Sequence, residues 1–272
     1  MLLRKRPKRR KPRKPRELKQ GIYILPNLFT TGNLFCGFFA IAAAVNYKFK
    51  TAAVAILVSC LFDILDGKVA RLTNSQSRFG VEYDSLADLV AFGVAPAVVM
   101  YLWALQPFGR LGWVAAFLFV ACGALRLARF NVQVNSVSKE YFIGLPIPGA
   151  ACMVATTVLF LYHLGGNGPT KHFLLLAMTY LLGFLMVSTI PYNSFKEFNR
   201  LQRMPFRSLF LTILVLSVVA AQPAVMLFTL MALYLVSGPF EYLWKLAKRS
   251  SSQLPEEAPQ EQSVQIRPGV EQ

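Results

Sequence analysis

The stretch from Asp63 to Asp88, D-I-L-D-G-K-V-A-R-L-T-N-S-Q-S-R-F-G-V-E-Y-D-S-L-A-D, places four carboxylates inside or at the ends of apolar segments. They belong to Asp63, Asp66, Asp84 and Asp88, and uncharged apolar runs flank the stretch on both sides. A charged carboxylate in hydrocarbon costs on the order of 2.5–3.5 kcal/mol on insertion scales. Four of them in one predicted helical hairpin therefore indicate a site that uses them.

Helical spacing predicts that these four acids converge. Asp63 and Asp66 lie within about 60° of each other on one helix, and Asp84 and Asp88 are one turn apart on the next. The polar link 72–79 is short, which favours antiparallel neighbours with Asp63 opposite Asp88 and Asp66 beside Asp84. Small residues on the same faces leave space beside the acids: Gly67, Ala70, Gly80, Ala87, Ala91 and Ala95.

The convergence of like charges predicts a metal site. Carboxylates this close cannot all ionise unaided. Divalent cations with a preference for oxygen, Mg²⁺ or Mn²⁺, would relieve the repulsion, and two ions bridged by shared carboxylates match the number of acids. A proton relay, or a set of buried protonated acids, is the alternative interpretation of the same spacing.

Eight residues of the stretch stand at fixed gaps, Asp63-x2-Asp66-Gly67-x2-Ala70-Arg71-x8-Gly80-x3-Asp84-x3-Asp88. This pattern resembles the signature of the CDP-alcohol phosphatidyltransferases at every fixed position. The resemblance implies an all-α membrane protein with a six-helix core, which transfers a phosphatidyl group from a CDP-linked lipid to an alcohol. It also implies divalent cations at the four acids and a homodimer.

Composition supports a polytopic membrane helical bundle. Hydrophobic residues make up 55% of the chain and charged residues only 15%. We expect about eight transmembrane helices, the six-helix core of the family plus a C-terminal pair. The spans are roughly 27–46, 51–72, 84–105, 111–131, 147–164, 172–190, 207–221 and 223–244. They lie within a membrane domain over residues 21–249.

Polar tails flank this predicted domain. Residues 1–20 contain eleven of the 29 Lys and Arg, with prolines that discourage a helix. This disordered basic tail is either a topology signal or a segment attracted to anionic lipid head groups. No folded recognition module accompanies it, so the net charge of +16 does not indicate nucleic acid. Residues 250–272 are rich in Ser, Pro, Glu and Gln and also predict disorder.

The distribution of basic residues predicts the orientation in the membrane. One side receives both tails and most loop Lys and Arg, and the other receives only Lys48, Lys50, Arg110 and Lys171. Positive charge marks the cytoplasmic side. We therefore expect a multi-pass protein of the inner (cytoplasmic) membrane with both termini and the acids facing the cytoplasm.

The first span predicts contacts to the nucleotide lipid. Thr30, Asn33 and Gly37 share one face of this helix. Asn and Thr in membrane helices commonly cap or form interhelical hydrogen bonds, which is the alternative role. In the family this helix borders the nucleotide pocket, and the resemblance implies that Asn27, Thr30 or Thr31 contacts the CDP portion.

The acid-bearing hairpin supplies further candidates for binding CDP-diacylglycerol. Gly67 and Ala70 lack bulk on the acidic face, which permits a flat base or ribose to lie against the backbone. Arg71 suits a phosphate, although an arginine at a helix end also snorkels to the interface. Ser77 resembles a hydroxyl position that contacts the nucleotide lipid in relatives, and Gly80 is a fixed position of the signature.

Arg126 and Arg129, three residues apart on the fourth span, predict an anion site, with positive-inside anchoring as the alternative. Segments 125–131, 144–148 and 191–196 resemble the phosphatidylserine synthase branch of the family. That resemblance implies L-serine as acceptor, with its carboxylate on Arg126 or Arg129. Glycerol 3-phosphate or an inositol phosphate is the alternative acceptor.

The implied mechanism is direct, metal-assisted transfer. Asp88 accepts the proton of the serine hydroxyl, which attacks the lipid-side phosphorus and releases CMP. A distant alternative is a cation transporter, because carboxylates in membrane helices also build ion pathways. Transport predicts acids spread over the depth of the membrane in repeated halves, whereas these acids occupy one hairpin without a second copy.

Overall fold

The computed structural model describes residues 24–73, 77–133, 142–166, 168–169, 171–192 and 221–251. Almost all of them are helical. The helices are α1 (Ile24–Val45), α2 (Phe49–Leu72), α3 (Arg78–Asp88), η2 (Leu89–Val94), α4 (Ala95–Met100), η3 (Tyr101–Leu105), η4 (Gln106–Phe108), α5 (Arg110–Gln133), α6 (Ile147–His163), α7 (Phe173–Val187) and α9 (Pro223–Ser251). One short antiparallel pair joins β1 (Phe142–Ile143) to β2 (Pro191–Tyr192).

The described helices confirm a helical, multi-pass membrane protein. Four helical runs are long and apolar enough to cross a membrane: Pro26–Val45, Arg78–Phe108, Arg110–Val132 and Pro223–Tyr242. Two shorter apolar helices, α6 and α7, accompany them. Seven of the eight predicted spans coincide with helices, and α2 is among them. The remaining span, 207–221, lies outside the described residues except for residue 221, so the number of eight stays a prediction. The predicted tails also fall largely outside.

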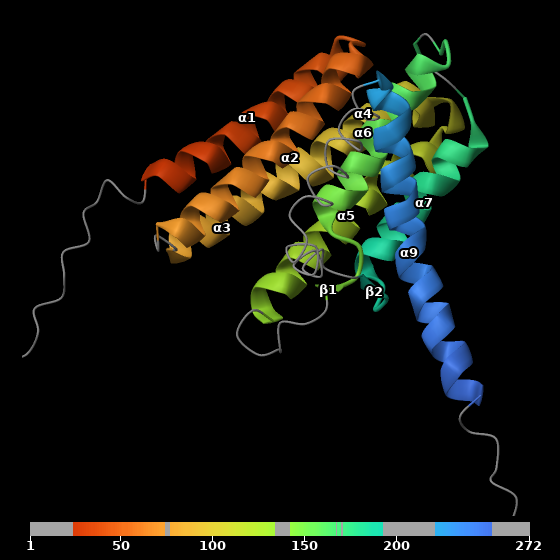
Figure 1. Cartoon of the computed structure of the whole chain (residues 1–272). Coiled ribbons are helices and arrows are strands. Elements are labelled where there is room, and N and C mark those ends of the chain that lie inside the picture. The colour runs from red at the N-terminus through yellow and green to blue at the C-terminus, as the bar shows by residue number, and fades with distance from the viewer. Residues whose placement is uncertain are drawn as a thin grey trace, which may run out of the picture.

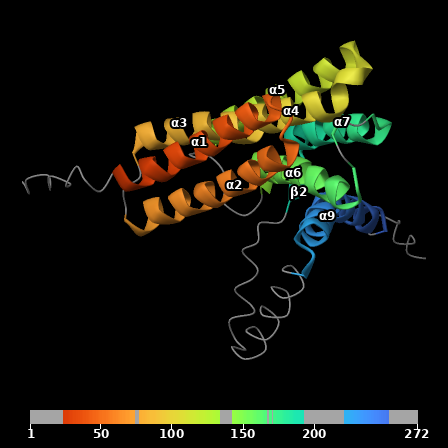
Figure 2. The ribbon, with the colours of Figure 1, turned by 90° about the horizontal axis from the view of Figure 1, so that it is seen from above.

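Helix α1 lies beside both α2 and α3 (Figures 1 and 2). In Figure 1 the start of α1, the end of α2 and the start of α3 share one end of the bundle. α2 also packs against α6, and α6 packs against α9. Fully buried alanines allow the close approach of these helices, including Ala40, Ala44, Ala52, Ala53, Ala91 and Ala95.

A wide helical turn, η2, follows Asp88 directly. Within it the N–H of Ala95 donates to the carbonyl of Val90, five residues earlier rather than four. Pro96 comes next, and a proline ring clashes with the carbonyl four residues before it in a regular helix. The wider turn accommodates Pro96 without breaking the third span.

At Gly37, the backbone of α1 packs directly against the backbone of this turn. A Cβ at Gly37 would lie 2.6 Å from the Cα of Ala91, so only glycine fits there. Asn33 is one turn before Gly37 on α1, and Asp88 is three residues before Ala91. The close approach therefore sets Asn33 and Asp88 beside each other.

Candidate active site

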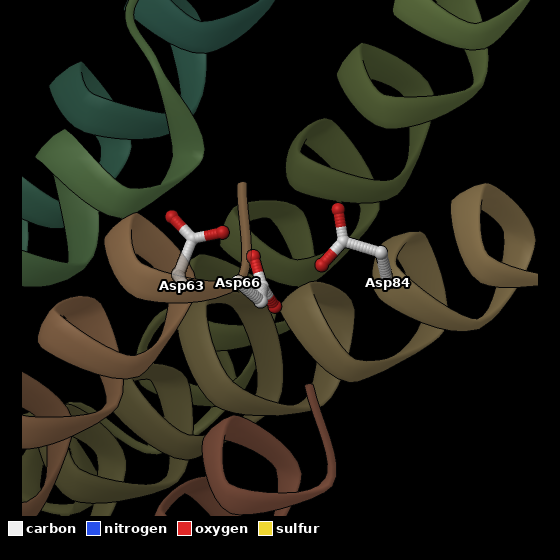
Figure 3. Close-up of side chains that lie close together, drawn as sticks. All are labelled: Asp63, Asp66 and Asp84. Carbon is white, nitrogen blue, oxygen red and sulfur yellow. The ribbon is translucent and has the colours of Figure 1, made fainter. Parts of the chain in front are cut away.

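Three of the four predicted acids form a cluster. Asp63 and Asp66 come from α2 and Asp84 from α3, and each offers a carboxylate oxygen within 4.8 Å of the others. Figure 3 shows the Asp84 side chain extending toward Asp66 and Asp63 from the neighbouring helix. The carboxylates therefore come together as the spacing predicts, although the two helices pack mainly against α1, which contacts both, rather than against each other as neighbours.

Asp66 is held from α1. Its side chain is buried, and Oδ2 accepts a hydrogen bond from Oγ1 of Thr30 at 3.0 Å. Thr30 is itself buried. The first span, predicted to border the nucleotide pocket, therefore also positions a member of the acid cluster.

Asp84 carries an unpaired buried oxygen. Its Oδ1 has no hydrogen-bond partner among the described residues. A buried charged group without a partner is strongly unfavourable, and such an atom in a native protein calls for a bound group. Carboxylate oxygens are the ligands that Mg²⁺ and Mn²⁺ prefer. The donor set of Asp63, Asp66 and Asp84 therefore fits a divalent cation.

Asp88 lies beside this cluster rather than in it. It is buried and within electrostatic range of the other three acids. Its Oδ1 accepts a hydrogen bond from Nδ2 of Asn33 at 2.9 Å, and Asn33 Oδ1 in turn accepts from the hydroxyl of Ser59. Both Asn33 and Ser59 are fully buried. This Ser59–Asn33–Asp88 chain fixes the carboxylate from α1 and α2.

Sequence reasoning did not include Asn33 and Ser59 among the site residues. The shared face of Thr30, Asn33 and Gly37 was the available signal, since the structure turns that face toward Asp66, Asp88 and Ala91. No comparable signal marks Ser59, because a lone serine in an apolar run is ordinary.

The start of α3 brings together three of the residues predicted to bind the nucleotide lipid. Ser77 caps the helix, with its Oγ accepting from the N–H of Gly80 at 2.9 Å. A Cβ at Gly80 would lie 3.1 Å from that Oγ and 3.5 Å from Oδ1 of Asn27. Ser77 thus has a capping role that its predicted role in binding did not include.

Gly67 and Arg71 form a second small group on α2. Nε of Arg71 donates to the carbonyl of Gly67 at 2.8 Å, which folds the guanidinium back over the glycine. A Cβ at Gly67 would meet only Nη2 of Arg71, at 3.8 Å. Ala70 is half-buried on the same helix. On α1, Oγ1 of Thr31 lies 3.0 Å from the hydroxyl of Tyr83.

The two arginines of α5 differ in their surroundings. Nε of Arg126 is buried without a hydrogen-bond partner among the described residues. The Arg126 side chain lies within electrostatic range of Asp88 and of Tyr234 on α9. Arg129 is half-buried, and the described residues form no hydrogen bond or ion pair with it. Only Arg126 is thus placed beside the acids.

Comparison with known proteins gives a consistent result. The family model described as CDP-alcohol phosphatidyltransferase matches residues 23–191. The chain is 42% identical over 229 residues to the CDP-diacylglycerol–serine O-phosphatidyltransferase of Helicobacter pylori (strain ATCC 700392 / 26695), covering 84% of this chain and 94% of the relative.

Two further relatives have the same name. The protein from Bacillus subtilis (strain 168) is 37% identical over 174 residues, which are 64% of this chain and 92% of the relative. The protein from Mycobacterium leprae (strain TN) is 32% identical over 228 residues, which are 81% of this chain and 75% of the relative. The matched residues include the acid cluster, and the chain belongs to the CDP-alcohol phosphatidyltransferase family.

Proposed function

We propose that this protein transfers the phosphatidyl group of CDP-diacylglycerol to L-serine, giving phosphatidylserine and CMP. The proposal rests on the family match and on relatives named for this reaction. The structural observation that carries it is the cluster of Asp63, Asp66 and Asp84 with Asp88 beside it. The same observations favour phosphatidyl transfer over cation transport, and the names of the relatives favour serine over glycerol 3-phosphate or an inositol phosphate.

The acid cluster holds the divalent cations in this proposal, two ions of Mg²⁺ or Mn²⁺. Asp63, Asp66 and Asp84 would supply the clustered oxygens. Asp88, which lies beside them, would supply the fourth carboxylate. The unpaired Oδ1 of Asp84 supports this assignment. Divalent cations bound there supply positive charge to the diphosphate of the liponucleotide and to the departing CMP.

Asp88 is the proposed general base. Asn33 engages its Oδ1, which leaves Oδ2 to accept the proton of the serine hydroxyl. The serine oxygen forms a bond to the lipid-side phosphorus while the bond from that phosphorus to the CMP oxygen breaks. No residue of the protein becomes covalently attached, so one displacement completes the transfer.

The proposed substrate contacts surround this centre. CDP-diacylglycerol lies against the residues that the signature and the first span provide: Asn27, Thr30, Thr31, Gly67, Ala70, Arg71, Ser77 and Gly80. The guanidinium of Arg71 over Gly67 supports a phosphate contact. The carboxylate of serine binds at Arg126 or Arg129, and the unpaired Nε of Arg126 supports the former.

The proposal also includes the setting of the enzyme. Residues 21–249 form the membrane domain, with tails at 1–20 and 250–272, in the inner membrane of the cell. Both termini and the acid cluster face the cytoplasm, where serine is available. The protein acts as a homodimer among membrane lipids and has no nucleic-acid partner. The excess of Lys and Arg on one side supports this orientation.

A panel of acceptors tests the proposed reaction. Detergent-purified protein receives CDP-diacylglycerol and Mg²⁺ with L-serine, glycerol 3-phosphate, inositol phosphate or no alcohol. We expect CMP release and phosphatidylserine with L-serine alone, and loss of both when EDTA removes divalent cations. A different lipid product would show that the acceptor is wrong, and full turnover in EDTA would show that the metal site is wrong.

A further inference from the structure

Asn131, near the end of α5, is joined to Ser85 of α3 by side-chain hydrogen bonds. Nδ2 of Asn131 donates to Oγ of Ser85 at 3.0 Å. The Ser85 hydroxyl donates either to Oδ1 of Asn131 at 3.4 Å or to the carbonyl of Val81 at 3.1 Å. The bond from Nδ2 forms whichever acceptor the hydroxyl takes, because it uses the oxygen of Ser85 and not its hydrogen.

This contact connects two helices whose backbones otherwise approach each other little. Along the third span, α5 packs closely against η2, α4 and η3, which follow the acids. Among the described residues, the backbone of α3 makes few contacts with α5. Both Ser85 and Asn131 are half-buried. The pair therefore ties the end of α5 to the part of the third span that carries Asp84 and Asp88.

Each member of the pair shares a helix with one residue of the proposed acceptor site. Ser85 is three residues before Asp88, the proposed base, on α3. Asn131 is five residues after Arg126 on α5, which is about 7.5 Å along the helix axis. Arg126 lies within electrostatic range of Asp88. The position of α5 against α3 thus determines how far the Arg126 guanidinium lies from the Asp88 carboxylate.

The separation of these two groups matters for a small acceptor. In serine only a few bonds separate the hydroxyl from the carboxylate, so the base and the guanidinium must lie close together to engage both at once. An arginine fork also binds a carboxylate in a defined geometry. A small displacement of α5 would therefore weaken the binding of serine before it disturbs the acid cluster, to which α5 contributes no residue.

We infer that Asn131 is a positioning residue for the acceptor: by binding Ser85 it holds α5 against α3, and this fixes Arg126 at the distance from Asp88 that suits serine. The inference rests on the proposed function, since it places the acceptor carboxylate on Arg126. Neither Ser85 nor Asn131 is a fixed position of the signature, which fits a role in binding the acceptor rather than in the transfer itself.

Asn131→Ala tests this role, because it removes the amide and leaves the acids and both arginines in place. Steady-state kinetics in detergent give the KM for L-serine, the KM for CDP-diacylglycerol and the Mn²⁺ requirement separately. One hydrogen bond between helices is lost, so we expect the serine KM to rise about three- to tenfold. The kcat, the KM for CDP-diacylglycerol and the Mn²⁺ concentration for half-maximal activity should stay within about twofold of the wild type.

A double-mutant cycle shows whether the effect passes through Ser85. Ser85→Ala should produce the same rise, and the double variant should rise no further than either single one, because all three lack the same bond. Ser85→Thr keeps a hydroxyl and should retain the wild-type KM. Ser237→Ala on α9 is the matched control, since this exposed serine donates to the carbonyl of Tyr234 on its own helix. It should change none of the constants.

Two results would overturn the role of Asn131 while the proposed function stands. One is an unchanged serine KM in Asn131→Ala, or a rise shared equally by all the constants, which would reflect a structural role alone. The other is a double variant whose effect is the sum of the two single effects in free energy. If the wild type itself fails to use L-serine, the proposed function fails, and the inference for Asn131 fails with it.

Discussion

Asn33 of α1 holds Asp88 of the third span through one hydrogen bond, from Nδ2 to Oδ1 at 2.9 Å. The amide cannot turn over freely, because the hydroxyl of Ser59 donates to its oxygen. With all three groups buried, the direction of the Asp88 carboxylate is set by α1 and α2 rather than by its own helix. This relationship makes Asn33 a positioning residue.

Asn33→Ala should therefore lower kcat while leaving substrate binding nearly intact. A hydrogen bond to a charged group contributes about 1.5–3 kcal/mol, which corresponds to a loss of about 10- to 100-fold in rate. Steady-state CMP release measures it. Asn46→Ala is the control, since Asn46 only donates to the carbonyl of Ala42 at the far end of α1. A variant in which KM rises and kcat is unchanged would contradict the positioning role.

Asp84→Asn separates stability from activity. Asp84 is half-buried, and its buried Oδ1 has no hydrogen-bond partner among the described residues. The substitution puts a neutral amide in place of this carboxylate, so in EDTA we expect a higher thermal unfolding temperature than that of the wild type. Activity should fall by more than about 100-fold, since even outer partners of a metal site are worth about 10- to 100-fold.

Thermal unfolding in detergent and titration with Mn²⁺ measure these two effects. Glu82→Gln on the same helix is the control, because Glu82 is exposed and its loss should change neither quantity. Undiminished Mn²⁺ binding in Asp84→Asn would show that Asp84 is not a metal ligand.

Gly37→Ala should destabilise the bundle and impair catalysis together. The added Cβ would lie 2.6 Å from the Cα of Ala91, so α1 and η2 must separate. Overpacking of this kind costs on the order of 1–3 kcal/mol. Gly183→Ala on α7 is the matched control, since its Cβ would meet atoms only at 3.7–3.8 Å. Equal unfolding temperatures for the two variants would contradict the close approach.

The two arginines of α5 should respond differently to loss of charge. Arg126→Gln is expected to raise the KM for L-serine by about tenfold or more, because a hydrogen bond between charged groups is lost. Arg129→Gln should have the smaller effect, since the described residues place only Arg126 beside Asp88. Kinetics at saturating CDP-diacylglycerol distinguish them. If neither variant changes the KM, the serine carboxylate binds elsewhere.

Much of the site follows from local spacing. The cluster of Asp63, Asp66 and Asp84 could be predicted because helical periodicity and a short link determine which side chains share a face and lie level with each other. The packing of α1 against both α2 and α3 could not be predicted in this way. The placement of Asp88 outside that cluster could not be predicted in this way. It depends on how α1 approaches the third span, and a single sequence does not give the rotation of one helix against another.

The same reason explains a residue that was missed. Ser59 acts across a helix interface, and its own segment shows only an ordinary apolar pattern. For Ser77, the predicted contact with the nucleotide lipid stays a prediction, and the structure adds a cap on α3 that its residue type already favours. Arg126 and Arg129 look alike in sequence, and only the structure separates them, through the buried Nε of Arg126 and its place beside Asp88.

The wide turn η2 has a consequence for how the third span can change. A turn with one additional residue shifts everything beyond it by about 100° around the axis relative to a regular helix. The half that carries Asp84 and Asp88 and the half from Ala95 onward are therefore out of rotational phase. Deleting one residue between them would rotate Asp84 and Asp88 relative to the rest of the third span without changing either side chain. The length of this turn therefore determines the direction of the carboxylates, and so the activity, as much as the carboxylates themselves do.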